Sequence, residues 1–192
     1  LHKIKSIKSM KIKHPYKKEN NNCVSIYYPC GKDSYSNQIR KYILNLIIDQ
    51  PFFSKLRTKD QLGYRVGFFS KTKRDDIYLI AKVQSEKDTK HILDRIKIFF
   101  NEFNDILLNM NNKTWNNWKK TVEKNLKKRN ESTNSLFSKY GNEIFNRKYR
   151  FNSKEMLLKE LKSLKLKHIQ EYYQKNVLNS KKKKIIQVLK RT

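Results

Sequence analysis

The sequence has 192 residues, of which 37% are hydrophobic and 12% are aromatic, so it is long enough to bury one substantial core. Only 4 Gly and 3 Pro are present, which excludes collagen-like and low-complexity classes. There is no run of 18 apolar residues and no apolar stretch after the basic first residues, so we expect neither a membrane-spanning helix nor a signal peptide.

The net charge of +28 suggests an anionic partner, but its distribution argues against nucleic acid. The chain has 36 Lys, 9 Arg and 20 Asn, and they occur in every segment. A compositional bias spreads charge in this way, whereas a binding site concentrates it, and nucleic-acid readers favour Arg for bidentate contacts. The densest cluster, Lys181–Lys184, is interpreted as a solvated loop. A polyanion-binding module therefore stays an alternative only.

The two cysteines, Cys23 and Cys30, lie seven residues apart. In a continuous strand an odd spacing points two side chains to opposite faces, so we expect no disulfide between them. Free cysteines suit a reducing compartment, and we expect a cytoplasmic protein.

The N-terminal segment, residues 1–20, is basic with isolated apolar residues. It suits an arm or an edge strand in front of a domain that covers residues 21–192. The first residues of that domain, Cys23–Tyr28, alternate as a strand does. Turn-forming residues are expected to end this strand: Pro29, Gly31 and Asp33.

The following segment has helical spacing and begins at a cap that either Ser34 or Ser36 supplies. Pro51 is expected to interrupt or kink this helix. Gly63 stands where a left-handed C-cap would end the helical path. From Tyr64 onward the apolar residues alternate, so the segment is predicted to be a helix-to-strand junction.

Two alternating segments, Tyr64–Ser70 and Ile77–Ser85, predict a hairpin with a polar turn. Helical spacing then runs in a block from Thr89 to Val177, and Ile185–Leu189 is a last strand. The aromatic stripes of these helices, including the one at Leu136–Phe145, are interpreted as core packing. Because the helices follow the strands as a block, we predict an α+β fold, a mainly antiparallel sheet with a layer of helices on one face.

The sequence offers no self-sufficient catalytic set: it has no Gly-rich phosphate loop and no nucleophile elbow. His168, Glu171 and Tyr172 form an H-x-x-E-Y string, in which Tyr replaces the second His of a zinc-binding H-x-x-E-H helix, so no metal site is expected in this chain. What remains is Arg57 and Tyr64, a fixed cation and a phenol beside a Gly turn. Both are donors that could hold a carbonyl oxygen or the charge that develops on it.

Several strings in this chain closely resemble the last domain of the inverzincins, the pitrilysin-type (M16) zinc metallopeptidases. The most specific is the string L-R-T-K-D-Q-L-G-Y at residues 56–64. Supporting strings are Asn21–Tyr28, Gln84–Lys87 and, more loosely, Lys139–Ile144. The resemblance covers residues 20 to 190.

The resemblance implies four homologous α+β domains whose two halves close around a chamber that encloses peptides. It implies that zinc is bound by an H-x-x-E-H motif in the first domain, so this chain would need the N-terminal catalytic half of the same polypeptide. By motif position, Arg57 would contact the peptide carbonyl beside the scissile bond and Tyr64 would hold the oxyanion. Phe53 would line the pocket beside them. Peptides are the implied substrates, and a homodimer is compatible with the family.

Arg65 departs from this resemblance, because an apolar strand residue is expected after Tyr64. The difference suggests a pocket that favours acidic peptides. Some family members have inert halves, so a non-catalytic subunit or scaffold is a second reading beside the metalloendopeptidase.

Overall fold

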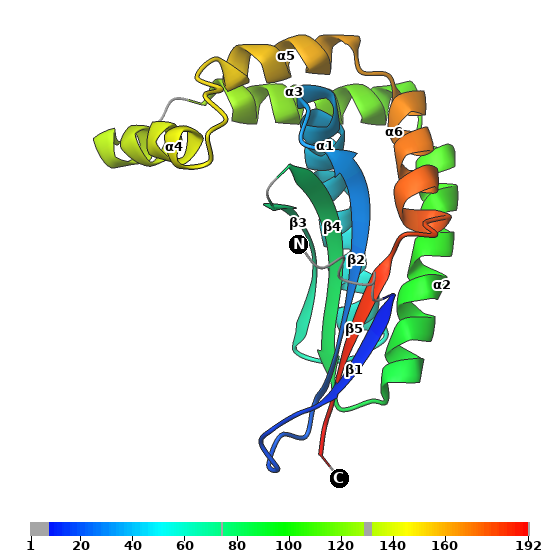
Figure 1. Cartoon of the computed structure of the whole chain (residues 1–192). Coiled ribbons are helices and arrows are strands. Elements are labelled where there is room, and N and C mark those ends of the chain that lie inside the picture. Colours follow the sequence, from blue (N-terminus) through cyan, green and yellow to red (C-terminus); the bar gives the residue numbers. More distant parts are fainter. Residues whose placement is uncertain (1–7, 74, 129–131, 192) are drawn as a thin grey trace.

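Five strands form one sheet in the computed structural model, which describes residues 8–73, 75–128 and 132–191 (Figure 1). The strand order is β1-β5-β2-β4-β3, and every pairing is antiparallel except that of β1 with β5. The predicted α+β class and mainly antiparallel sheet are confirmed. The strands have these bounds: β1 Ser9–Lys13, β2 Asn22–Lys32, β3 Arg65–Lys73, β4 Asp76–Ser85 and β5 Lys184–Leu189.

The described part of the basic N-terminal segment contains the edge strand β1, which is exposed along its whole length. Its sequence places Lys11 and Lys13 on an otherwise open edge, where charge disfavours pairing with a second sheet. Of the two alternatives for this segment, the structure adopts the edge strand over Ser9–Lys13. The first seven residues lie outside the described part of the chain.

Strand β2 runs four residues beyond its predicted end, so Pro29 and Gly31 do not stop it. Pro29 still pairs with Tyr78 of β4, and the register shifts between Pro29 and Lys32. Strand β5 pairs only with Cys23–Tyr27, so the last part of β2 is an edge on that side. Proline is tolerated at such an edge because no ladder there needs its missing N–H.

The helices that follow Ser34 and Asp88 begin at side-chain caps, as their sequences predict. Ser34 accepts a hydrogen bond from the N–H of Asn37 at 3.2 Å, and Asp88 accepts one from the N–H of His91 at 2.9 Å. The helical segments, of which the two labelled η are π-helical, have these bounds: α1 Tyr35–Phe53, η1 Ser54–Lys59, α2 Thr89–Leu108, α3 Asn112–Lys127, α4 Thr133–Phe145, α5 Ser153–Ser163, α6 Leu166–Tyr173 and η2 Gln174–Leu178.

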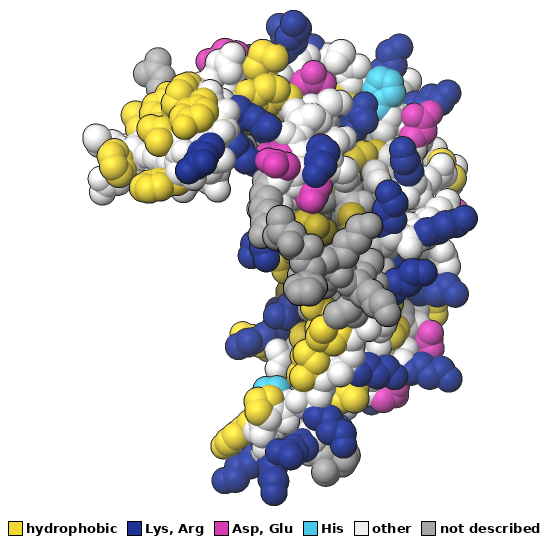
Figure 2. Space-filling view, viewed as in Figure 1, with side chains coloured by type: hydrophobic (Ala, Val, Ile, Leu, Met, Phe, Trp, Pro, Cys, Tyr) yellow, Lys and Arg dark blue, Asp and Glu magenta, His cyan; other side chains and the backbone are white. Residues whose placement is uncertain are grey.

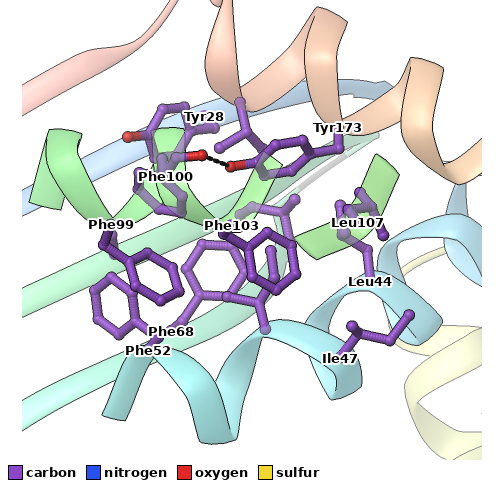
Figure 3. Close-up of a cluster of buried hydrophobic side chains, with 14 of the residues drawn as sticks. Tyr28, Leu44, Ile47, Phe52, Phe68, Phe99, Phe100, Phe103, Leu107 and Tyr173 are labelled. Carbon is purple, nitrogen blue, oxygen red and sulfur yellow. Dashed lines mark hydrogen bonds between the residues drawn. The ribbon is translucent and has the colours of Figure 1, made fainter. Parts of the chain in front are cut away.

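The core is an aromatic cluster between the sheet and the helices α1, α2 and α6 (Figure 3). Phe52 of α1 and Phe99 of α2 meet edge to face with ring centroids 5.0 Å apart, a favourable geometry for aromatic pairs. The buried Tyr173 donates its hydroxyl to the carbonyl oxygen of Phe100 at 2.5 Å. The buried phenol of Tyr173 therefore has a hydrogen-bond partner. The aromatic residues on one face of each of these helices pack into the core, as predicted.

Helix α4 behaves differently, because none of its residues is buried. It projects beyond the end of the sheet in Figure 1, and hydrophobic side chains gather over it in Figure 2. Phe137 is 76% exposed and Phe145 is 86% exposed. The interpretation of Leu136–Phe145 as core is therefore wrong. Helical spacing shows which residues share a face, but it does not show whether another element covers that face.

Both cysteines are free, and burial raises the pKa of the Cys30 thiol to about 11. Cys23 is partly exposed while Cys30 belongs to the buried face of β2, as their odd spacing predicts. Among the helices of the described residues, none is both long and apolar enough to cross a membrane.

Candidate functional site

The junction after α1 is a continuous helical path that widens into the π-helical segment η1. Pro51 lies inside α1 and does not interrupt it, since the helix continues to Phe53. The N–H of Asp60 donates to the carbonyl of Lys55 at 2.9 Å, the wider spacing typical of a π turn. Such turns occur often at functional sites, because they re-aim the side chains that follow.

Gln61, with a φ of 49°, takes the left-handed position after this turn, so the prediction that Gly63 is the left-handed C-cap is wrong. Gly63 is required for a different reason. A Cβ there would lie 2.2 Å from the carbonyl oxygen of Gln84 in β4. The glycine therefore lets the loop lie directly against the sheet before β3 begins at Arg65.

The structure brings the three predicted site residues together around the guanidinium of Arg57. Its central carbon lies 4.8 Å from the ring centroid of Phe53 and 4.8 Å from that of Tyr64. Arg57 thus lies between two rings, an arrangement that stabilises a cation and fixes its side chain. Tyr64 is 81% exposed, and Arg57 has no acidic partner among the described residues.

Two ion pairs tie this junction to α2. Arg95 donates to both carboxylate oxygens of Asp60, at 2.9 and 2.7 Å, and the Asp60 side chain is only 10% exposed. Lys55 lies 3.0 Å from Glu102. Bidentate Arg–carboxylate pairs are among the strongest ion pairs in proteins, so the pair of Arg95 with Asp60 holds in place the backbone that carries Arg57.

Sequence reasoning missed Asp60 and Arg95. One signal was available: Asp60 is the only acid within the string at residues 56–64, where it stands among basic neighbours. Its partner could not be found from sequence, because Arg95 lies 35 residues away on another helix.

The arrangement offers two hydrogen-bond donors on a rigid support. The aromatic rings beside the guanidinium carry no negative charge, so its positive charge stays available to a ligand. The Tyr64 hydroxyl is accessible. Fixed donors of this kind stabilise negative charge that develops on an oxygen without first having to reorganise. The site can therefore bind a carbonyl oxygen or an oxyanion, but it contains no nucleophile.

The H-x-x-E-Y string does not fit a zinc ion. The Nδ1 atom of His168 accepts the backbone N–H of Lys165 at 3.3 Å, Glu171 lies 4.0 Å from Lys167, and Tyr172 is buried. Across residues 8–73, 75–128 and 132–191, no group of three or more His, Cys, Asp or Glu is arranged to hold a metal ion. The described residues therefore offer no ligand set for zinc.

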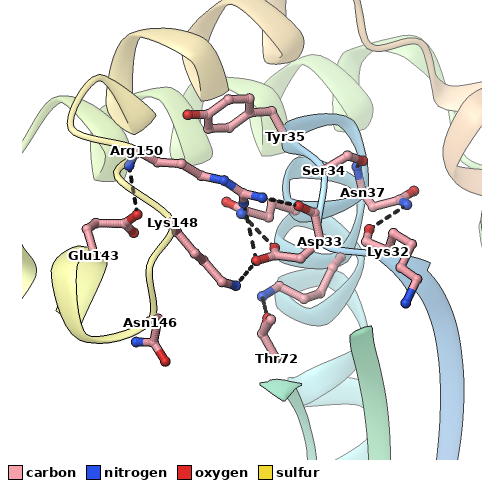
Figure 4. Close-up of polar contacts among 12 residues, drawn as sticks. Lys32, Asp33, Ser34, Tyr35, Asn37, Thr72, Glu143, Asn146, Lys148 and Arg150 are labelled. Carbon is pink, nitrogen blue, oxygen red and sulfur yellow. Dashed lines mark hydrogen bonds and ion pairs between the residues drawn. The ribbon is translucent and has the colours of Figure 1, made fainter. Parts of the chain in front are cut away.

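A second charged cluster surrounds the buried carboxylate of Asp33, at the turn from β2 to α1 (Figure 4). Lys148 forms a close ion pair with it, the Arg150 Nη1 atom lies 3.2 Å away, and Gln38 donates at 2.7 Å. Burial alone would raise the pKa of Asp33. The hydrogen bonds from Lys148 and Gln38 and the nearby positive charges outweigh burial and hold this pKa below its usual value. The cluster fastens the α4–α5 connection to the domain.

Comparisons with known proteins agree with this description. The profile of a family described as PQQ synthase PqqF-like, C-terminal lobe domain 4, matches residues 43–140. A nardilysin-like protein of Arabidopsis thaliana is 25% identical over 173 residues, which are 88% of this chain and 17% of that protein. Insulin-degrading enzyme of Drosophila melanogaster is 25% identical over 166 residues, 83% of this chain and 17% of that enzyme.

The crystal structure of pitrilysin matches with a TM-score of 0.79 at 20% identity, over 94% of this chain and 19% of that chain. At this identity the match shows a shared fold. The chain spans about a sixth of the length of the curated relatives it matches.

Proposed function

This chain belongs to the PqqF-like C-terminal lobe domains of the M16 metallopeptidases, and from that premise we propose that it is the substrate-binding C-terminal domain of a zinc metalloendopeptidase. The observation that carries the proposal is the stacking of Arg57 between Phe53 and Tyr64, with the charge of Arg57 unpaired. A structural arginine would be expected to have an acidic partner.

In this proposal Arg57 donates to the peptide carbonyl beside the scissile bond, and Tyr64 donates its hydroxyl to the oxyanion that forms on attack. Phe53 fixes the guanidinium and lines the pocket. A single well-placed donor of this type contributes about 2.7–4 kcal/mol of transition-state stabilisation. The ion pair between Asp60 and Arg95 keeps both donors in place, which makes Arg95 a positioning residue.

Zinc would be bound by another domain, because the described residues of this chain offer no ligand set. The metal would supply the Lewis acid of peptide hydrolysis. The chain alone would then be inactive, and its first partner would be the N-terminal catalytic half of the same polypeptide. A cytoplasmic location is supported by the two free cysteines, and a homodimer remains part of the proposal.

The experiment is peptide hydrolysis by the purified full-length protein, measured with an internally quenched peptide. We expect activity that a zinc chelator abolishes and that added zinc restores. Tyr64→Phe should lower kcat about 100-fold with little change in KM, because the hydroxyl acts in the transition state. Tyr16→Phe, which alters another exposed tyrosine, is the matched control and should keep full activity.

A fully active Tyr64→Phe enzyme would refute the site. Full-length protein that retains zinc and hydrolyses no peptide would refute the peptidase and favour the non-catalytic scaffold.

A further inference from the structure

Strand β3 forms one edge of the sheet, and no described strand pairs with its outer side (Figure 1). It is nine residues long and pairs with β4 in one continuous register from Arg65 to Lys73, without a bulge. In an antiparallel strand every second residue turns its N–H and C=O away from the neighbouring strand. The outer side of β3 therefore presents a regular row of backbone donors and acceptors that no described strand uses.

The two edges of the sheet differ in how they are protected. The short strand β1 carries Lys11 and Lys13, whereas the central part of β3, Val66–Ser70, contains neither a charge nor a proline. Native proteins protect exposed edges with charges, prolines or bulges, because an open edge pairs readily with another chain. The central part of β3 has none of these protections, so it is suited to receive an added strand.

The inner face of β3 is held against the rest of the domain. Val66 and Phe68 belong to the buried core, and Lys41 of α1 donates a hydrogen bond to the Thr72 hydroxyl at 3.4 Å. The backbone of the edge is thus fixed before any ligand arrives. An extended peptide that pairs with it has to order only itself, which reduces the entropic cost of binding.

The outer face of β3 carries the side chains that a paired peptide would meet. Arg65 and Lys71 are exposed near its two ends, and neither forms an ion pair with a described residue. Between them Phe69 is 42% exposed, and a Cβ at Gly67 would meet no atom within 4 Å. Gly67 therefore leaves room beside Phe69 for a bulky side chain of the added strand.

A second copy of this chain is a poor partner for this edge. Two copies that pair antiparallel about Phe68, the centre of the uncharged part, would place Arg65 of one copy opposite Lys71 of the other. Like charges directly opposite each other destabilise a strand pair, and the net charge of +28 adds to the repulsion. The edge suits a chain that brings acidic side chains to these two positions.

The edge also begins at the Arg57 site. Strand β3 starts at Arg65, directly after Tyr64, whose side chain is 81% exposed. A peptide whose carbonyl oxygen is bound by Arg57 and Tyr64 therefore lies at one end of the edge, and its extended chain can continue along β3. At about 3.3 Å per residue, Lys71 lies about 20 Å along the strand from Arg65.

We propose that the outer edge of β3 binds the peptide substrate as an added strand, and that Arg65 and Lys71 select acidic side chains. The inference rests on the proposed peptidase function and names its substrate class. These are extended peptides with two acidic residues spaced to face Arg65 and Lys71 and a bulky apolar residue between them. In strand addition, main-chain hydrogen bonds supply affinity and side-chain contacts supply selectivity.

The test is the binding of labelled peptides to the full-length protein, measured by fluorescence anisotropy in the presence of a zinc chelator so that the peptides stay intact. Two peptides differ only in carrying Glu or Lys at the two positions that face the cations. The wild type should bind the acidic peptide about 10-fold more tightly. Arg65→Glu/Lys71→Glu should reverse this preference, because the charges on the two strands are then exchanged.

The matched control, Lys90→Glu/Lys97→Glu, makes the same change of charge on the exposed face of α2 and should keep the preference for the acidic peptide. A third peptide, with Gln at both positions, should bind the wild type and the β3 variant within about 2-fold, which shows that the variant folds. A preference that reverses equally in both variants, or in neither, would overturn the proposal, because the selectivity would then not come from β3.

Backbone pairing is tested by methylating one N–H of the acidic peptide at a time. Strand pairing uses every second N–H, so affinity should fall about 10-fold at alternate positions and change little between them. An equal loss at every position would overturn the added strand. Binding is measured without turnover, so peptides that show this alternation and charge exchange but are not cleaved by the zinc-loaded protein would refute the peptidase and support the edge.

Discussion

Among the described residues, two arginines lie over aromatic rings, and they differ in whether a carboxylate neutralises their charge. Arg57 lies 4.8 Å from both Phe53 and Tyr64, whereas Arg150 lies 5.4 Å from Tyr35. Arg150 also pairs with the buried carboxylate of Asp33 at 3.2 Å and donates to its backbone carbonyl at 2.6 Å. Arg57 has no such partner among the described residues.

This difference distinguishes an arginine that stabilises the fold from one whose charge is available to a substrate. The charge of Arg150 is neutralised inside the domain, where it holds the α4–α5 connection to the turn before α1 (Figure 4). The rings of Phe53 and Tyr64 hold the guanidinium of Arg57 in place and leave its charge available to a substrate. Changes around Arg150 should therefore affect folding, and changes around Arg57 should affect turnover.

The largest expected effect on stability comes from Asp33→Asn. It removes the acceptor of Lys148 and Arg150, and should lower the free energy of unfolding by about 3 kcal/mol. This is the low end for a broken buried ion pair, since both cations keep some access to water. Chemical denaturation measures the change.

Asp94→Asn is the matched control for that variant, because Asp94 is exposed on α2. It should change the unfolding free energy by less than about 0.5 kcal/mol. If Asp33→Asn unfolds at the same denaturant midpoint as the control, the structural role of this cluster is wrong.

A smaller effect, on activity, is expected from Arg95→Gln. Without the bidentate pair to Asp60 the junction should loosen, and kcat should fall about 10-fold, because small displacements of positioned groups slow catalysis. The remaining contact of Lys55 with Glu102 limits the loss. A rise in KM alone, with kcat preserved, would show that Arg95 does not position the donors.

The smallest effect is the pH dependence of stability that Asp33 contributes. Its pKa is lower in the folded chain than the unfolded value of about 3.9, so the unfolded state binds the proton more readily. The contribution is fully present above about pH 4 to 5 and is lost as pH falls through the folded pKa. The difference in unfolding free energy between wild type and Asp33→Asn should shrink below pH 4. A difference that grows on acidification would contradict this assignment.

The sequence was sufficient for the elements whose signals are local. Capping residues and apolar spacing located α1, α2 and the hairpin, and the string at residues 56–64 brought Arg57 and Tyr64 to attention. Their proximity follows from the turn between them, because the six residues of π turn and loop that separate them bring the two side chains together.

The sequence was insufficient where a residue is required because of its contact with another residue that is distant in the sequence. Gly63 is needed because of Gln84, and Asp60 is held by Arg95. The face of α4 has the spacing of a packed helix, but no described element covers it. The spacing of apolar residues describes one helix or strand at a time, whereas these features depend on contacts between two elements.

The most direct test of the central claim is to measure turnover and thermal stability of the full-length Arg57→Ala variant together. Lys59→Ala is its control, because it removes the same charge from an exposed position on the same turn. The account predicts that Arg57→Ala lowers kcat/KM at least 100-fold while its Tm stays close to that of the control. Unchanged turnover, or a loss of activity that a fall in Tm fully explains, would contradict the claim that Arg57 is held for substrate.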